Sequence, residues 1–171
     1  MQCLKNSKNI QQKPQKTYNK KMSTQLIGNT LSIIGLIIGL GAVTVIDVHG
    51  FLGQKSGYWT KATITAHKIT KPLIWLGTIV FILGRLILNI TAGDNITQIQ
   101  WLQSLILIPM VINGLFLSFY VSPYLLKQEK LGKIDEILPK KLQTKILVSF
   151  IFSFTSWWGS VVLLILEITK Y

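Results

Sequence analysis

Long stretches without charge alternate with lysine-rich connections along this chain of 171 residues. Four stretches of about twenty residues or more are nearly free of charge, at 26–46, 72–92, 99–126 and 146–168. A helix of about twenty residues crosses the roughly 30 Å hydrocarbon core of a bilayer, since each residue adds about 1.5 Å. The pattern therefore predicts an all-α integral membrane bundle of four transmembrane helices.

The polar residues 1–25 precede the first predicted span. They include six lysines and no acid, with almost no apolar side chains to bury. This composition predicts a disordered basic tail, followed by a membrane domain over 26–171. The apolar run that starts at Leu26 is too long for a secretory signal peptide. Two other interpretations stay open for the tail, an organelle transit peptide and a translation start at Met22.

Composition agrees with a membrane protein and indicates its orientation. Hydrophobic residues make up 49% of the chain and charged residues only 14%, against roughly 25% charged in soluble domains. The net charge of +12 favours anionic lipids of the bilayer as partners, and we expect no nucleic-acid binding. The loops 47–71 and 127–145 hold four and six lysines, so we expect both in the cytoplasm of a bacterial cell whose cytoplasmic membrane holds the protein.

The second and fourth spans share a short sequence echo. Trp75-Leu76-Gly77-Thr78-Ile79-Val80 resembles Trp157-Trp158-Gly159-Ser160-Val161-Val162. In a four-span topology these two spans cross the membrane in the same direction. A 2+2 parallel repeat, in which a two-helix unit was duplicated, would produce this echo, and so would chance in apolar sequence.

Small residues form a stripe on the first predicted span. Gly28, Ser32, Gly35 and Gly39 are three or four positions apart and therefore share one face of a helix. Small side chains at this spacing let a second helix approach closely. Our first functional hypothesis is a binding or accessory membrane protein, without catalytic activity, that packs on itself or on another membrane protein through this stripe.

Polar residues inside the spans suggest a second hypothesis. Arg85 is the only arginine and lies within the second span, where a charge needs a partner or a route to water. The parallel fourth span brings Glu167 to a similar depth. Asn113 lies in the third span and is expected to form a hydrogen bond between helices. Arg85, Glu167 and Asn113 suggest the polar site of a small transporter subunit, whereas the alternatives for Arg85 are a structural ion pair or snorkelling to the headgroups.

The two histidines suggest a third hypothesis. His49 follows the first span and His67 precedes the second, so both lie on one side of the membrane. Imidazole is a common ligand of haem iron and of copper, and Asp47 could assist. A membrane redox protein with haem b or copper is therefore an alternative, and the other interpretation is that both rings are hydrated among the headgroups.

Several segments resemble a known group of proteins. Gly39-Leu40-Gly41-Ala42-Val43-Thr44-Val45-Ile46-Asp47, Leu73-Ile74-Trp75-Leu76-Gly77, Ser122-Pro123 and Thr155-Ser156-Trp157-Trp158 carry the resemblance. It is to small bacterial four-helix membrane proteins that are distantly similar to domain-of-unknown-function and copper-resistance-protein-D-like families. The resemblance implies a four-helix membrane fold. Members of the copper-resistance-like group typically have a histidine within the first helix, whereas His49 here follows the predicted span.

Overall fold

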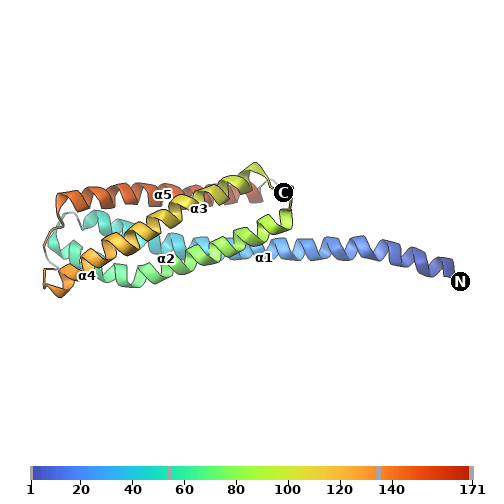
Figure 1. Ribbon diagram of the computed structural model, residues 1–171, viewed down its shortest axis with the longest axis horizontal. Helices are drawn as coiled ribbons and strands as arrows, with labels where there is room; N and C mark the ends of the chain where they lie inside the picture. Colours follow the sequence, from blue (N-terminus) through green and yellow to red (C-terminus); the bar gives the residue numbers. More distant parts are fainter. Residues whose placement is uncertain (1, 54, 134–135, 170–171) are drawn as a thin grey trace.

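The computed structural model describes the backbone of residues 2–53, 55–133 and 136–169, and side chains in these ranges from residue 21 onward. The helices are α1 (Gln2–Leu52), α2 (Gly57–Ala92), α3 (Gln98–Phe116), the π-helix η1 (Leu117–Val121), α4 (Ser122–Lys130) and α5 (Lys140–Ile168). Because α3, η1 and α4 follow one another without a break, they form one rod (Figure 1). Four helical segments are long and apolar enough to cross a membrane, which confirms the predicted four-helix membrane bundle.

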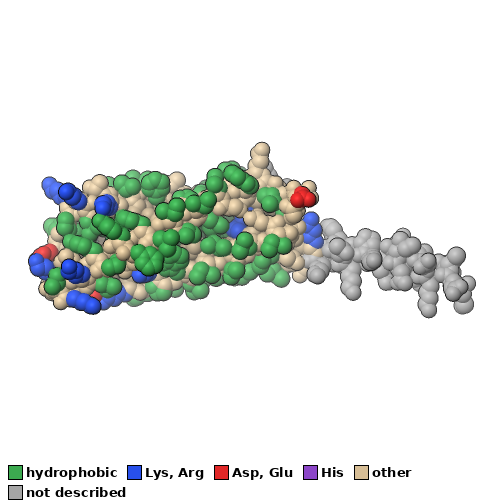
Figure 2. Space-filling view, in the orientation of Figure 1, with side chains coloured by type: hydrophobic (Ala, Val, Ile, Leu, Met, Phe, Trp, Pro, Cys, Tyr) green, Lys and Arg blue, Asp and Glu red, His purple; other side chains and the backbone are tan. Residues whose placement is uncertain are grey.

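The bundle has two distinct ends. We call the end with the α1–α2 turn and the 131–139 connection the lysine-rich end, since blue lysine side chains gather there in Figure 2. Hydrophobic side chains cover the middle of the bundle in the same view. Many of them face outward, including Ile37, Ile90 and Phe119, which are 67%, 80% and 76% exposed. This outer surface suits contact with lipid chains rather than with water.

The second helix is longer than the predicted span at the lysine-rich end. α2 begins at Gly57, so Pro72 lies inside the helix and not in its first turn. The backbone hydrogen bonds of the helix continue through polar sequence, and the Thr70 hydroxyl, which could compete with them, instead donates to the Ala66 carbonyl of its own helix over 2.9 Å. The predicted span counted only the residues needed to cross hydrocarbon, and the helical hydrogen bonds extend further.

The first helix also exceeds its predicted limits. Its backbone is helical from Gln2, where the sequence predicted a disordered tail, and it projects beyond the bundle in Figure 1. Lysine and glutamine are good helix formers, and extending an existing helix avoids the cost of nucleation. At its other end α1 continues to Leu52, so His49 lies within the first helix, contrary to the prediction.

Helices α1 and α2 pack with their backbones in contact. A Cβ atom added at Gly35 would meet the backbone of Phe81 and, at 2.8 Å, the carbonyl oxygen of Gly77. A Cβ atom at Gly84 would lie 2.6 Å from the amide nitrogen of Ser32. The small-residue stripe on α1 therefore packs on α2 within the same chain. This face is not available to a partner protein, and a partner would have to bind elsewhere.

Contacts between the two helix pairs are reciprocal. The Trp157 ring of α5 packs on Gly39 of α1, and the Trp75 ring of α2 lies 3.6 Å from the Cβ position of Gly114 on α3. Each tryptophan thus reaches from the second helix of one pair to a glycine on the first helix of the other pair. The two tryptophans are 82 positions apart and the two glycines 75, so the contacts do not follow one repeat offset, and the duplication stays a prediction.

Candidate functional site

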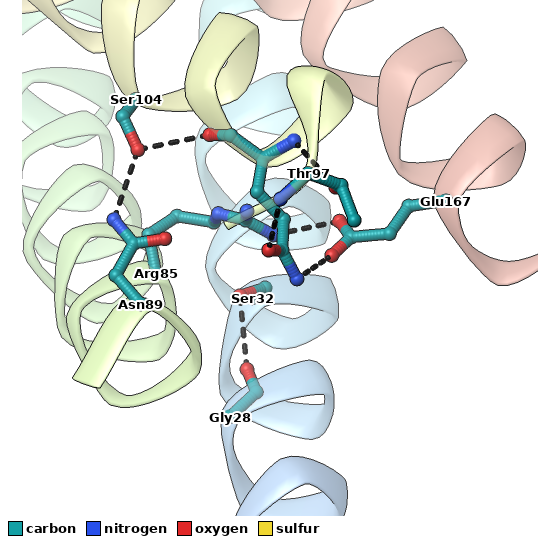
Figure 3. Close-up of polar contacts among 8 residues, drawn as sticks. Gly28, Ser32, Arg85, Asn89, Thr97, Ser104 and Glu167 are labelled. Carbon is teal, nitrogen blue, oxygen red and sulfur yellow. Dashed lines mark hydrogen bonds and ion pairs between the residues drawn. The ribbon is translucent and has the colours of Figure 1, made fainter. Parts of the chain in front are cut away.

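A buried ion pair joins α2 and α5 near the end opposite to the lysine-rich end. Arg85 Nη1 donates a hydrogen bond to Glu167 Oε2 over 2.8 Å, and the two side chains are 1% and 7% exposed (Figure 3). The parallel course of the two helices brings these residues to one depth. Of the two alternatives for Arg85, the structure has the ion pair, since a guanidinium so deeply buried does not snorkel.

The ion pair also joins equivalent positions of the sequence echo. Arg85 and Glu167 are 82 positions apart, the same spacing as between Trp75 and Trp157. If an axis relates the two helix pairs, residues at equivalent positions can touch only close to that axis. The spacing of the ion pair equals that of the echo, and the 2+2 repeat stays a prediction.

Gln100 is a second hydrogen-bond donor to the Glu167 carboxylate. Its Nε2 atom donates to Glu167 Oε1 over 2.8 Å, so each carboxylate oxygen accepts a hydrogen bond from a buried side chain. Gln100 is held by a capping box at the start of α3, in which its Oε1 accepts from Thr97 N at 3.1 Å and Thr97 Oγ1 accepts from Gln100 N at 3.3 Å. The beginning of α3 is thus fixed to the end of α5.

Further polar groups surround the ion pair. Asn89 Nδ2 donates to Ser104 Oγ over 3.0 Å, and Ser104 Oγ donates to the Gln100 carbonyl over 3.0 Å (Figure 3). Among the described residues, Arg85 Nε and Nη2, Asn89 Oδ1 and both amide atoms of Gln103 are buried without a hydrogen-bond partner. An unpaired buried polar group costs about 1–3 kcal/mol. This end of the bundle therefore retains several donors and acceptors with unused capacity.

Asn113 belongs to a different part of the bundle from the ion pair. Its Oδ1 accepts a hydrogen bond from Ser149 Oγ over 2.6 Å, which links α3 to α5. The expected hydrogen bond between helices is therefore present. The predicted grouping of Asn113 with Arg85 and Glu167 is absent. The hydrogen-bond partners of Glu167 are Arg85 and Gln100. A transporter role for this group stays a prediction.

A cavity of about 70 Å³ lies inside the bundle toward the lysine-rich end. It is lined by three ionisable side chains, Asp47 from α1 and both His67 and Lys71 from α2. Asp47 Oδ2 and His67 Nε2 are buried without a hydrogen-bond partner among the described residues. His67 as a whole is 8% exposed. The wall of the cavity is otherwise largely apolar, with Ile74, Trp75, Leu117, Val121, Leu125 and Phe150 among its residues.

A polar face of α2 forms one side of this cavity. Thr60, Thr63, His67 and Lys71 follow at three- and four-residue steps, so they share a helix face. Thr60 Oγ1 donates to the Gly53 carbonyl over 2.9 Å, and Thr63 Oγ1 donates to the His49 carbonyl over 2.7 Å. The His49 carbonyl also accepts from Gly53 N over 2.7 Å, so the two hydroxyls add bonds to carbonyl groups at and just after the last turn of α1. The same contacts fix the polar face of α2 against α1.

The π-helix η1 forms the opposite side of the cavity. Leu117, Ser118 and Val121 line the cavity, and Ser122 N donates to the Leu117 carbonyl in the wide turn. A physical reason lies in Pro123, whose ring would clash with the carbonyl group four residues earlier in a regular α-helix. Short π-helical turns occur frequently at functional sites. This observation adds weight to the cavity as the candidate site.

The two predicted histidine ligands point to different surroundings. His67 lines the cavity, whereas His49 does not; its Nδ1 lies 2.8 Å from the Val45 carbonyl and its ring contacts Trp59 edge to face. The Asp47 carboxylate accepts a hydrogen bond from Ser153. Within the described ranges, no three His, Cys, Asp or Glu side chains are grouped so that they could hold a metal ion. The geometry brings Asp47 and His67 to one cavity, and the haem or copper role stays a prediction.

Several residues of both polar groups escaped the sequence analysis. Gln100 carried a readable signal, because Thr97-x-x-Gln100 before an apolar run matches the capping-box pattern. Lys71 and Ser118 carried none, since a lysine near the end of a span and a serine in a helix are common. Comparison with protein-family models, with curated proteins and with solved structures finds no match to this chain.

Proposed function

We propose that this multi-pass membrane protein binds a small amphipathic molecule in the cavity toward its lysine-rich end. The observation that carries the proposal is the pair of unpartnered polar atoms, Asp47 Oδ2 and His67 Nε2, in a cavity with largely apolar walls. Ligand pockets typically combine apolar walls with a few placed polar groups. A ligand with a polar head and an apolar body would fit both parts.

Lys71 favours an acidic head group. Its Nζ atom has only long contacts, 3.4 Å to the Ser118 carbonyl and 3.5 Å to Ser122 Oγ, at or beyond the usual upper limit of about 3.2 Å. An ammonium group has three hydrogen atoms to donate, and its hydrogen bonds to carboxylates are shorter and stronger than those to neutral oxygens. A carboxylate at Lys71 would place the apolar body of the ligand beside Ile74 and Trp75, one turn further along α2.

A cysteine in the cavity tests this proposal. In a background with Cys3 replaced by serine, Thr63→Cys should react with a small water-soluble thiol reagent, and propionate, whose size suits a cavity of about 70 Å³, should slow that reaction. Thr63 lines the cavity and is 7% exposed. Thr78→Cys is the matched control, because Thr78 is 4% exposed on the same helix and does not line the cavity. The reaction rate of each variant is measured in nanodiscs.

The head-group assignment is tested in the same assay. Lys71→Gln should abolish most of the protection by propionate, whereas Lys61→Gln, which removes an exposed lysine of the same helix, should leave it unchanged. Equal rates for Thr63→Cys and Thr78→Cys would show that no molecule enters the cavity. A Thr63→Cys rate that neither propionate nor propylamine changes would overturn binding itself.

We further propose that the protein lies in a bacterial cytoplasmic membrane with its lysine-rich end in the cytoplasm. The support is the lysine count, which is ten in residues 47–71 and 127–145 against seven in residues 1–25 and at the C-terminus, or against one if translation starts at Met22. Basic segments of this kind resist translocation across the membrane. Both chain termini would then lie on the outer side.

Cysteine labelling in intact cells tests this orientation. In the Cys3→Ser background, cysteines at Lys61 and Lys133 should resist a membrane-impermeant thiol reagent, while a cysteine at Asp94 should react, because Asp94 follows α2 at the opposite end. All three should react in permeabilised cells, which controls for exposure. Labelling of the first two positions alone in intact cells would reverse the orientation.

A further inference from the structure

A second hollow lies on the outer surface of the bundle, between α3 and α5. This groove has a volume of about 870 Å³, and Ile112, Phe116, Val148 and Phe152 form much of its apolar part. Ile112, Val148 and Phe152 are 61%, 48% and 57% exposed, so the groove opens away from the helix bundle. In a membrane this surface faces the lipid chains.

Two lysines line the same groove near the start of α5. Lys141 and Lys145 are one turn apart and share a helix face with Val148 and Phe152. Lys145 is held in place, since its Nζ atom donates to the Tyr120 hydroxyl over 2.7 Å and lies 4.5 Å from the centre of that ring. One lysine of the groove is therefore already oriented before any ligand binds.

The positive charge at this position has no acidic counterpart in the described part of the chain. The ion pairs there are Lys68–Glu129, Arg85–Glu167 and Lys133–Glu136, and none includes a lysine of α5. The first turn of α5 contains no acid, although its free N–H groups add a further partial positive charge. An anion beside Lys141 and Lys145 would offset both contributions.

We propose that this groove binds one anionic phospholipid. The phosphate lies at Lys141 and Lys145, and an acyl chain lies along Val148, Phe152 and Ile112. Charge complementarity and position support this assignment, because Lys141 and Lys145 lie at the start of α5, at the lysine-rich end, and Val148 and Phe152 follow toward the middle of the bundle. This site is separate from the inner cavity, with which it shares only the lining residue Ser149.

Lipid-dependent stability tests the proposal. The protein in a neutral detergent is titrated with phosphatidylglycerol, with phosphatidylcholine of the same acyl chains, and with inorganic phosphate, and its melting temperature is recorded. Phosphatidylglycerol should raise the melting temperature, whereas phosphatidylcholine and inorganic phosphate should not. Each lysine near an anionic head group strengthens lipid binding. The loss of both in Lys141→Gln/Lys145→Gln should therefore raise the half-maximal phosphatidylglycerol concentration about thirtyfold.

A charge-matched variant separates a site from general attraction. Lys61→Gln/Lys127→Gln removes the same charge from exposed lysines of α2 and α4 that do not line the groove, and its half-maximal concentration should stay near that of the wild type. Equal losses in the two double variants would overturn the proposal in favour of diffuse electrostatic attraction. Equal stabilisation by the two lipids would also overturn it, and an effect of inorganic phosphate would identify a free-anion site instead.

Discussion

Replacing Glu167 with glutamine is expected to lower the free energy of unfolding by about 3–5 kcal/mol. The substitution keeps the shape of the side chain but leaves the Arg85 guanidinium, 1% exposed, without its counter-charge. A buried charge that has lost its partner cannot regain hydration while the bundle stays folded. Denaturation of the purified protein in detergent, followed by circular dichroism, measures the loss.

A double-mutant cycle shows that the loss comes from the pair. Arg85→Leu added to Glu167→Gln should recover part of the stability, because no uncompensated charge then remains. Glu129→Gln is the control, since the Lys68–Glu129 pair is 48% and 36% exposed and should contribute no more than about 1 kcal/mol. Strictly additive effects of the Arg85 and Glu167 substitutions would mean that the two side chains do not interact.

Replacing Gly35 with alanine is expected to destabilise the bundle by about 1–3 kcal/mol. The new methyl group would meet the backbone of Phe81 and the Gly77 carbonyl oxygen, 2.8 Å from the Cβ position. Backbone atoms cannot rotate aside as a flexible side chain can, so α1 and α2 would have to move apart. The midpoint of thermal unfolding in detergent measures the effect.

Gly41 offers a matched control on the same helix. A Cβ atom at Gly41 meets nothing within 4 Å, so Gly41→Ala should leave the packing intact. Alanine is the better helix former by up to about 1 kcal/mol, and the variant should be as stable as the wild type or slightly more stable. If Gly35→Ala and Gly41→Ala have the same stability, the close contact of α1 and α2 contributes little to the free energy of unfolding.

The helices extend beyond the predicted membrane spans. Hydropathy identified the four segments because crossing a bilayer requires about twenty apolar residues in a row. It did not show that α2 begins at Gly57, because the backbone hydrogen bonds of the helix continue through polar sequence. A helix segment that does not cross hydrocarbon needs no run of apolar residues and leaves no hydropathy signal.

The sequence by itself determined that this protein is a bundle of four membrane-crossing helices, and it indicated which helices run parallel. The parallel course of the second and fourth spans was enough to pair Arg85 with Glu167. The depth of each residue in the membrane follows from its number of residues from the end of its span. Only the tertiary structure decided which helix covers the stripe of Gly28, Ser32, Gly35 and Gly39, and that the covering helix is α2 of the same chain. It alone also placed Asp47, His67 and Lys71 around one cavity. Periodicity fixes the face on which a residue lies, but the rotation of each helix about its axis is set by packing against its neighbours.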